Sequence, residues 1–414
     1  MKQKVLVFFP HNISPPKSGA HRRCIGILTG LKELGYEIIL LSATFTSVTK
    51  WNPNSINNLK KDLVKNIYIY EFTKLDKLFI RFFGKYCELI KKSPPLSSAI
   101  NCPLGMRKWF ARIFEEVSPT LILMNYAYWD KLIDHKRYSH VCRVIETLDI
   151  VTVNRQMQQV LDKEMPLESI KNGTIDSSVL QEDFFEKLEL NTDTKEFQIY
   201  DKSDYTIAIS KKEAELIKEN THKTKVVLIP VVQEPSKLIN QYTGPALFTC
   251  GPNPFNTQGY FYFTKRALPI IKEKIPSFSL QITGEFWYHQ QPKLEEGITF
   301  SGFIPELKEV YESARFFVSP VFGGTGQQIK ITEAMANGLP VIALHSGARD
   351  TPIQHGINGF IANNAKEFAT YIIKLWNDKK LCGEMGNAAR ETIAKKFSRS
   401  YLLKKLNSIV PLNK

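Results

Sequence analysis

Short apolar runs alternate with amphipathic stretches along most of the chain, and this alternation limits its possible folds more than any other feature. The first run, residues 5–10, contains no polar side chain, which is typical of a strand buried on both faces of a parallel sheet. Apolar residues at helical spacing follow from about residue 21 to 34, and Gly35 stands where a helix-ending glycine is expected. Strand, helix and strand in this order predict a doubly wound α/β domain.

The pattern occurs in two series, separated by a connection rich in proline and polar residues at 234–245. In the first series we expect further strands at 37–42, 67–72, 121–125, 144–147 and 205–209. In the second we expect strands at 246–250, 278–283, 298–301, 316–320, 341–344 and 359–361, and helices at 258–274, 305–313 and 327–337 before two terminal helices. The sequence therefore predicts two Rossmann-like α/β/α domains, 1–235 and 236–395, with 396–414 as a C-terminal helix that packs back toward the first. Two such domains would face a central cleft, where ligands bind at the carboxyl ends of the strands.

Composition narrows the class of protein. Hydrophobic residues make up 43% of the 414 residues, enough to bury two cores in a globular protein. No apolar run approaches the roughly 18–20 residues that span a bilayer, and residues 5–9 are too short for a signal peptide. The six cysteines are scattered without a CxxC pair, so we expect buried, reduced thiols in a cytoplasmic protein.

Two ligand classes are excluded. The net charge of +14 favours anionic partners, but it is spread along the chain without a nucleic-acid-binding module, so no nucleic acid partner is expected. A dinucleotide-dependent dehydrogenase would carry a GxGxxG loop after its first strand, and residues 11–19 lack it.

A glycine-rich loop between an expected strand and an expected helix carries the clearest chemical signal. Its glycines, which allow close approach of the backbone to a ligand, are Gly323, Gly324 and Gly326. The helix expected from Gln327 points its positive dipole end at the same place, and Lys330 follows one turn further on. Glu333, on the same helix face as Lys330, suits a ribose or sugar hydroxyl. The loop predicts a nucleoside-diphosphate site; the alternative is a flexible turn with a solvated Lys330–Glu333 pair.

Residues 330–342, KITEAMANGLPVI, resemble the KxxEAMAxGxPVV signature of the retaining GT-B glycosyltransferases of family 4. The resemblance extends over the chain in the family's order. Segments 18–23 and 34–37 resemble the first loop and helix of the family's acceptor domain, and 204–210 its last strand. Segments similar to the strand ends and the HGxNG turn of the donor domain lie at 249–251, 282–284, 300–304 and 355–360.

This resemblance implies a hexosyltransferase-type enzyme (EC 2.4) that moves a sugar from a nucleoside-diphosphate sugar to an acceptor hydroxyl, with retention at the anomeric carbon. The acceptor is a glycan, a lipid-linked sugar or a small molecule, in cell-envelope polysaccharide, glycolipid or glycoconjugate synthesis. Amides, a helix terminus and Lys330 would stabilise the charge that grows on the β-phosphate. No cofactor and no metal is expected, since Asp149 and Asp201 lack the close acidic partner of a DxD motif.

The resemblance also implies roles for single residues. Those expected in catalysis are Lys330, Glu333 and Asp149. Those expected at the donor phosphates are Gly19, Gly251, Gly323, Gly324, Thr325, Gly326, Gln327 and Lys330. Those expected at the ribose or base are Glu333, Gly302, Phe303, Ile304 and Glu285, and the acceptor-side candidates are His21, Arg22 and Arg23.

Two departures from the family pattern alter the expected site. Thr325 stands where the family's EX7E pair has its first Glu, so that contact is lost or made differently. The loop 251–259 lacks the Arg and Lys with which many relatives hold the diphosphate, so more of the phosphate charge falls on Lys330 and the loop amides. These departures keep a second hypothesis open: a GT-B protein that binds nucleotide sugars without transfer, or a GT-B hydrolase, epimerase or phosphorylase.

Several assignments have a plain structural alternative. Asp149 lies in a segment similar to the family's DxHD, with Leu148 in place of the His, and it suits either the anomeric centre or the N-cap of the next helix. His21 and the two arginines after it face either the cleft or solvent, and Glu285 contacts either the donor or solvent. Retention is compatible with a double displacement and with same-face departure and attack.

Residues 74–92 predict a basic amphipathic helix, with apolar residues at helical spacing and lysines and an arginine around them. Such a helix either packs its aromatic face on the sheet of the first domain or lies on an anionic membrane. The sequence favours packing, because an α/β domain needs such helices. In the membrane case the protein is peripheral at the inner face and the acceptor is lipid-linked.

Overall fold

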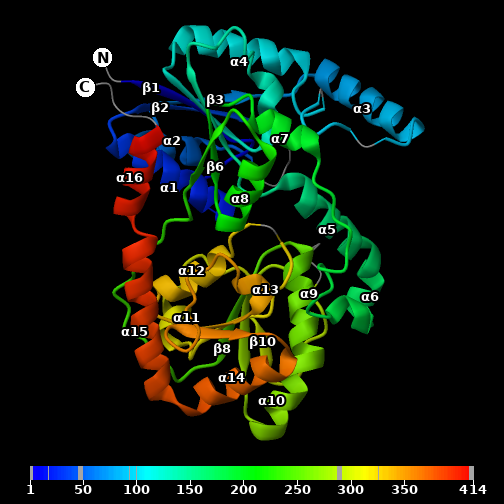
Figure 1. Ribbon diagram of the computed structural model, residues 1–414, viewed down its shortest axis with the longest axis vertical. Coiled ribbons are helices and arrows are strands. Elements are labelled where there is room, and N and C mark those ends of the chain that lie inside the picture. The colour runs from blue at the N-terminus through cyan, green and yellow to red at the C-terminus, as the bar shows by residue number, and fades with distance from the viewer. Residues whose placement is uncertain are drawn as a thin grey trace. The chain divides into compact units, whose positions relative to one another are not determined.

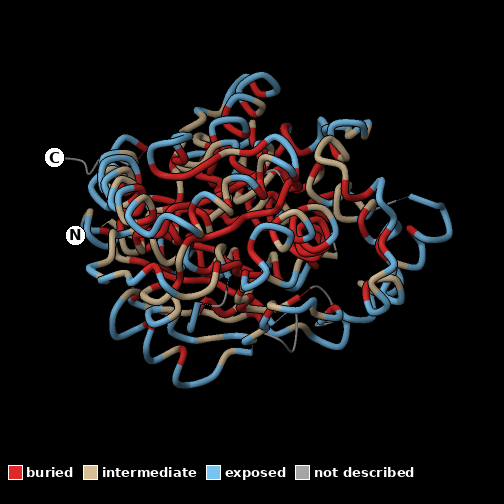
Figure 2. Tube along the Cα trace, turned by 90° about the horizontal axis from the view of Figure 1, so that it is seen from below, coloured by how far each residue is buried: buried red, intermediate tan, exposed pale blue. Residues whose placement is uncertain are grey.

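The computed structural model describes residues 3–16, 18–44, 50–92, 94–98, 100–286, 291–324 and 326–409 (Figure 1). The chain forms two compact units, and each is described by itself. Unit 1 comprises Met1–Thr152, Thr192–Pro230 and Arg399–Lys414, and unit 2 comprises Val153–Asn191 and Val231–Ser398. The strands carry many of the fully buried residues, and the helices expose their outer turns (Figure 2).

Unit 1 is built on a seven-stranded parallel sheet. Its strands are β1 (Lys4–Phe8), β2 (Glu37–Ala43), β3 (Asn66–Tyr70), β4 (Leu121–Asn125), β5 (Cys142–Glu146), β6 (Tyr205–Ala208) and β7 (Lys225–Leu228). They lie in the order β3-β2-β1-β4-β5-β6-β7, with Val7 of β1 between Leu40 of β2 and Leu123 of β4. The central strands are made of apolar residues without exposed surface, because helices cover both faces of the sheet.

The helices of unit 1 are α1 (Gly19–Glu33), α2 (Pro53–Asp62), α3 (Lys74–Leu89), α4 (Leu104–Val117), η1 (Ala127–Leu132), α7 (Thr194–Tyr200), α8 (Lys211–Asn220) and α16 (Arg399–Ile409). Helix α5 (Val151–Glu164) begins in unit 1 and lies mostly in unit 2. The expected glycine ends α1: Gly35 has φ +90°, and Tyr36 N donates to Leu31 O at 3.1 Å. Helix α16 packs on α1 so closely that a Cβ on Gly30 would lie 2.7 Å from Leu406 Cδ1.

Unit 2 is built on a six-stranded parallel sheet in the order β10-β9-β8-β11-β12-β13. Its strands are β8 (Ala246–Cys250), β9 (Leu280–Gly284), β10 (Ile298–Phe300), β11 (Phe317–Ser319), β12 (Val341–Leu344) and β13 (Gly359–Ala362). Its helices are α6 (Leu167–Asn172), η2 (Ser177–Leu180), α9 (Pro254–Tyr262), the π-helical turn η3 (Phe263–Ala267), α10 (Leu268–Lys274), α11 (Lys308–Ser313), α12 (Ile329–Ala336), α13 (His345–Ala348), α14 (Ala365–Asn377) and α15 (Lys379–Lys396). Both sheets have the strand order of a doubly wound fold, which confirms the expected fold class.

The segment Val153–Asn191 belongs to unit 2, although the range expected for the first domain, 1–235, included it. Hydrogen bonds from α9 hold this segment: Gln258 Nε2 donates to Val179 O at 2.9 Å, and Tyr262 Oη donates to Glu182 Oε1 at 2.6 Å. These bonds join residues about 80 positions apart, which a local pattern does not reveal.

The favoured packing of residues 74–92 on the sheet is wrong. These residues form the expected helix, α3, but its apolar side chains are exposed: Leu75 by 78%, Phe82 by 63% and Leu89 by 82%. Within α3, the buried residues are Asp76 and Cys87. Tyr70 Oη and the Thr73 hydroxyl donate to Asp76 Oδ2 at 2.6 and 2.8 Å, so polar contacts at the first turn attach the helix to unit 1.

All six cysteines are free thiols, and five of them are buried. Among the described residues, no helix has both the length and the apolarity that a membrane span requires.

Candidate active site

The carboxyl ends of β8 and β11 form the switch point of the unit 2 sheet. These two strands are neighbours, whereas β9 lies on the far side of β8. The connections after β8 and β11 therefore diverge, and ligands of doubly wound sheets bind in the crevice that this divergence leaves. Gly251 follows β8, and the glycine loop follows β11 and leads to α12.

Lys330, in the first turn of α12, reaches across to the residues that follow β8. Its Nζ donates to Asn256 Oδ1 at 2.9 Å. Asn256 is itself fixed, because its Nδ2 donates to Gly251 O at 3.0 Å and its backbone N donates to Asn253 Oδ1 at 3.0 Å. The lysine ammonium is thus held beside Gly251 by a neutral amide rather than by a carboxylate.

The environment of Lys330 leaves its charge available to an anion. Burial lowers the pKa of Lys330 to about 8, although Cys250 and Glu333 act in the opposite direction. Burial raises the pKa of Cys250 to about 12, so this thiol is neutral at pH 7. Lys330 is partly desolvated, and its hydrogen-bond partner is an uncharged amide. A phosphate that binds it therefore gains a stronger electrostatic attraction than it would from a solvated lysine.

Gly251 leaves room in front of this ammonium. A Cβ at this position would lie 3.6 Å from Lys330 Nζ and 3.7 Å from Asn256 Nδ2, so any longer side chain would point into the space that faces both groups. Gly251 and Lys330, both expected at the donor phosphates, therefore lie next to each other.

The glycine loop is constrained sterically as well as conformationally. Gly324 has φ +105°, a conformation that favours glycine. A Cβ on Gly323 would lie 2.4 Å from ring atoms of both Phe185 and Phe255, so these aromatic rings leave no space for a side chain. Gly326 is half-buried, and Thr325 lies outside the described residues.

Helix α12 presents its N-terminus to this loop. It begins at Ile329, two residues later than expected, and its first turn contains no acidic residue. Its N-cap residue, Gln328, makes no capping hydrogen bond through its side chain. The first amides of α12 thus point, uncapped by a side chain, toward the loop, which is the usual geometry of an anion site at a helix terminus.

Gln327 and Glu333 lie on either side of Lys330 and differ in their surroundings. The buried Gln327 accepts a hydrogen bond from Val231 N at 2.8 Å through its Oε1, so this oxygen fixes the connection before β8. Glu333 is half-buried on α12, one turn after Lys330.

Apart from Glu333 on α12, the residues expected at the ribose or base lie at the carboxyl ends of β9 and β10, beside β8. Gly284 ends β9 with φ +102°, and a Cβ there would lie 2.2 Å from Cys250 O, so the strand ends approach closely. Gly284 N donates to Gly302 O at 2.7 Å. This bond places Gly302 at the edge of the sheet that carries Gly251, followed by an exposed Phe303 and a half-buried Ile304, and it brings the half-buried Glu285 to the same edge.

The acceptor-side candidates in unit 1 separate into different environments. Arg23 is buried and binds Glu146 at the end of β5, with Nε donating to Oε1 at 3.1 Å and Nη2 to Oε2 at 3.3 Å. Its Nη1 donates to Pro230 O at 2.5 Å. Arg23 is therefore a structural residue and neither of the two expected alternatives, cleft or solvent, whereas its neighbour Arg22 is exposed.

His21 lies at the carboxyl end of β1. The His21 ring is buried 5.1 Å from the His11 ring and 5.8 Å from the Phe9 ring, between ring centroids. Burial lowers the pKa of His11, which favours a neutral imidazole there. Gly19 is the first residue of α1, directly after the N-cap Ser18.

Asp149 follows β5 and lies near Tyr126, which follows β4. Burial, and after it the charge of Asp149, raise the pKa of Tyr126. Leu148 has φ +61°, so the backbone turns sharply before Asp149. The Val151 and Thr152 amides at the start of α5 donate to the Glu196 carboxylate, both at 2.9 Å, so Glu196 binds two of the first amides of this helix.

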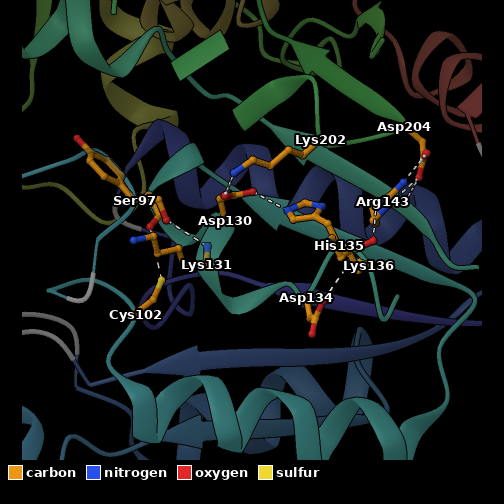
Figure 3. A network of polar contacts seen from close by, with 11 residues as sticks. Ser97, Cys102, Asp130, Lys131, Asp134, His135, Lys136, Arg143, Lys202 and Asp204 are labelled. Carbon is orange, nitrogen blue, oxygen red and sulfur yellow. Dashed lines mark hydrogen bonds and ion pairs between the residues drawn. The ribbon is translucent and has the colours of Figure 1, made fainter. Parts of the chain in front are cut away.

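A polar network holds the segment after β4 in place (Figure 3). Asp130 in η1 is buried, and its two oxygens bind His135 Nε2 at 2.7 Å and Lys202 Nζ at 2.8 Å. Although burial opposes ionisation, these bonds hold the pKa of Asp130 below its ordinary value. Arg143 joins the network: its guanidinium donates to His135 O and forms two bonds to Asp204, and its backbone N donates a third bond to Asp204. The network fixes η1 and therefore the position of Tyr126 just before it.

The residues that sequence reasoning missed are Asn253 and Asn256. The signal was present: Asn253 followed by Pro254 is typical of an N-cap and the first helical residue, and it places Asn256 in the first turn. We expected this helix to begin at residue 258, and in the loop 251–259 we noted Gly251 and the lack of basic residues but not the two asparagines.

Part of unit 2 is similar in sequence to a known protein family. Residues 244–378, most of unit 2, match the family model described as "Glycosyl transferases group 1". The poly(ribitol-phosphate) alpha-N-acetylglucosaminyltransferase of Staphylococcus aureus (strain COL) is 25% identical over 226 residues, which cover 47% of this chain and 45% of that protein. The chain spans less than half the length of the curated relatives it matches.

Solved structures match over nearly the full length. A mutant of S. aureus TarM, in complex with fondaparinux, α-GlcNAc-glycerol and UDP, superposes with a TM-score of 0.66 at 11% identity, covering 99% of this chain and 100% of that chain. Anabaena Alr3699/HepE in complex with UDP and glucose gives a TM-score of 0.61 at 12% identity, covering 98% of both chains. The fold is thus that of the GT-B glycosyltransferases, as expected, and residues 244–378 of unit 2 are similar to the glycosyl transferases group 1 family.

Proposed function

We propose that the protein is a retaining, metal-independent glycosyltransferase that moves a sugar from a nucleoside-diphosphate sugar to an acceptor hydroxyl. The observation that carries the proposal is the position of Lys330, held by Asn256 beside Gly251 at the switch point of unit 2. The match of residues 244–378 to the family model and the UDP in two structural neighbours support a nucleotide sugar as donor.

The chemistry assigned to this site is stabilisation of a leaving group. As the bond between the anomeric carbon and the β-phosphate oxygen breaks, the electron pair moves to that oxygen. The Lys330 ammonium, the glycine-loop amides and the α12 terminus are oriented before the reaction and meet this charge without reorganisation. Because these groups supply positive charge to the diphosphate, the proposal includes no metal. The acceptor oxygen bonds to the anomeric carbon, and its proton goes to the departing diphosphate.

Retention and the polar group at the anomeric centre rest on the resemblance of residues 330–342 and of the Asp149 segment to the retaining family. We assign Asp149 to this role because it follows the carboxyl end of β5 and lies near Tyr126, which follows β4. Glu333 is assigned to a donor hydroxyl, and Phe303 and Ile304 to the base. The anomeric configuration of the product, measured by NMR, tests retention directly.

The class of acceptor and the cellular location are part of the proposal. The similarity to an enzyme that acts on poly(ribitol-phosphate) supports an acceptor in cell-envelope or glycoconjugate synthesis. The six free thiols support a cytoplasmic location.

A thermal-shift screen with UDP, GDP, ADP and CMP sugars tests the donor site. We expect one nucleotide class to raise the melting temperature, since a ligand that binds only the folded state stabilises it. Lys330→Ala should abolish the rise, while Lys366→Ala, an exposed lysine on α14, should keep it. An equal response of Lys330→Ala and the wild type would contradict the phosphate site.

The second candidate is a GT-B protein that binds nucleotide sugars without transfer, or one that uses water or phosphate as acceptor. It is favoured by Thr325 in place of the first Glu and by Leu148 in place of a His. Measuring the release of nucleoside diphosphate distinguishes the candidates. A transferase releases it faster when the acceptor is present, and a hydrolase releases it without an acceptor. A binding protein does not release it under either condition.

A further inference from the structure

Helix α3 presents an apolar stripe that the described residues of unit 1 leave exposed. It extends from unit 1 beside α4 (Figure 1), and its exposed large hydrophobic residues, together with Ile90 after it, are Leu75, Leu78, Phe79, Phe82, Tyr86, Leu89 and Ile90. At about 100° per residue, positions 75, 79, 82, 86 and 89 follow one line along the helix. A stripe of this length on a surface helix marks an interaction site rather than scattered exposure.

The basic residues of this segment border the stripe on one side. Lys74, Arg81 and Lys85 fall next to Leu78 and Leu89 on the helix surface, since they repeat at spacings of seven and four. The six basic residues between 74 and 92 are exposed, and they are Lys74, Lys77, Arg81, Lys85, Lys91 and Lys92. None of these six side chains forms an ion pair with another described residue.

The acidic residues do not offset this charge. The segment contains two, Asp76 and Glu88, and Asp76 is buried in hydrogen bonds to Tyr70 and Thr73. Asp76 also lies on the side of the helix that carries Cys87, the second buried residue. One face of α3 therefore attaches to unit 1, the next carries the apolar stripe, and the basic residues lie beyond it.

We propose that α3 docks unit 1 on an anionic lipid bilayer, with the apolar stripe in the headgroup–acyl boundary and the basic residues on the anionic headgroups. Apolar and cationic stripes side by side on one helix match such an interface, where the acyl region takes the first and the phosphates take the second. A second copy of this chain would meet the same positive charge on α3, so charge complementarity favours the membrane. This inference concerns a surface of unit 1 and stands independently of the donor site in unit 2.

Flotation of the full chain with lipid vesicles tests the proposal. We expect binding to vesicles of phosphatidylcholine with about 30 mol% phosphatidylglycerol, weak binding to pure phosphatidylcholine, and loss of binding at high salt. Each basic residue near an anionic surface strengthens binding about fivefold, so Arg81→Glu/Lys85→Glu should weaken it at least about 25-fold. Phe82→Glu should weaken it more than about tenfold.

Matched variants test whether vesicle binding depends on the α3 surface or only on the overall charge and apolar surface of the protein. Lys60→Glu/Lys61→Glu changes two exposed lysines on α2 of the same unit and should lose much less than Arg81→Glu/Lys85→Glu. Ile239→Glu changes an apolar residue that is exposed elsewhere and should bind as the wild type does. The melting temperatures of all variants should agree with the wild type, since the side chains are exposed.

Three results would overturn the proposal. The first is absence of binding to anionic vesicles. The second is wild-type affinity of both Phe82→Glu and Arg81→Glu/Lys85→Glu. The third is a wild-type dimer, by light scattering, that Phe82→Glu converts to a monomer, which would assign the stripe to a second copy of the chain.

Discussion

The substitution Asn256→Asp places a negative charge next to the Lys330 ammonium, the group proposed to bind the diphosphate. Asn256 Oδ1 lies 2.9 Å from Lys330 Nζ, so a phosphate oxygen bound on the opposite side of the ammonium would lie roughly 5–6 Å from the new carboxylate. At an effective dielectric constant of about 20, one unit charge of phosphate at this distance is repelled by about 3 kcal/mol. The donor affinity should therefore fall about a hundredfold.

The protein should remain folded, because Asp in the first turn of α9 interacts favourably with the helix dipole. Titration calorimetry with the donor nucleoside diphosphate at pH 7 measures the loss, and Asn387→Asp, on an exposed turn of α15, is the matched control. The new carboxylate also raises the pKa of Lys330, so weaker binding could not be ascribed to loss of the lysine charge. An affinity within twofold of the wild type would refute the placement of the diphosphate at Lys330.

Three further predictions concern stability and the loop. Arg23→Ala leaves Glu146 buried without its partner and should cost about 3–5 kcal/mol in urea unfolding, against less than about 0.5 kcal/mol for the exposed Arg22→Ala. Burial raises the pKa of Glu213 from its ordinary 4.5 to about 7, so the folded state holds this proton more tightly than the unfolded state does. Stability from this group is full below about pH 4.5 and is lost as the pH rises through 7, by up to about 3 kcal/mol, and Glu213→Gln should flatten the unfolding free energy between pH 5 and 8. Gly323→Ala forces a Cβ against two aromatic rings and should lower stability by about 1–3 kcal/mol together with donor affinity.

For each of these three predictions, one experimental result would contradict it. Equal unfolding of Arg23→Ala and Arg22→Ala would show that the buried pair is not needed. A Glu213→Gln variant with the same pH slope as the wild type would assign that slope to other groups. Wild-type stability and donor binding of Gly323→Ala would show that the aromatic rings yield and that the loop is not constrained.

The strands that the sequence predicted best are those with continuous apolar runs. The bounds expected for β4, β8 and β12 coincide with the observed ones, because these strands are central and buried on both faces. Strand β7 was missed: it is at the edge of the sheet, has four residues and begins with the exposed Lys225. An edge strand faces solvent along one side, so its apolar signal is weak.

Helix starts were predicted less well than strands. Helix α9 begins at Pro254 and continues through the π-helical turn η3 into α10, whereas we expected one helix from residue 258. All residues of α9 are buried, so the helix has no exposed polar face from which its start could be recognised. The capping residue Asn253 was the better signal.

Of the candidate site, the sequence predicted the residues that a local motif contains. Lys330 and Gly251 came from such motifs, and the structure brings them together. The partners that fix them depend on tertiary contacts: Asn256 is 74 positions from Lys330, and Arg23 is 123 positions from Glu146. A single sequence carries no record of pairing over such separations.

The most direct measurement is a crystal structure of the protein with the nucleoside diphosphate selected by the thermal-shift screen. The account predicts β-phosphate oxygens within hydrogen-bond distance of Lys330 Nζ and of the first amides of α12, in front of Gly251. A diphosphate bound elsewhere, with Lys330 still on Asn256 and no anion beside it, would contradict the account.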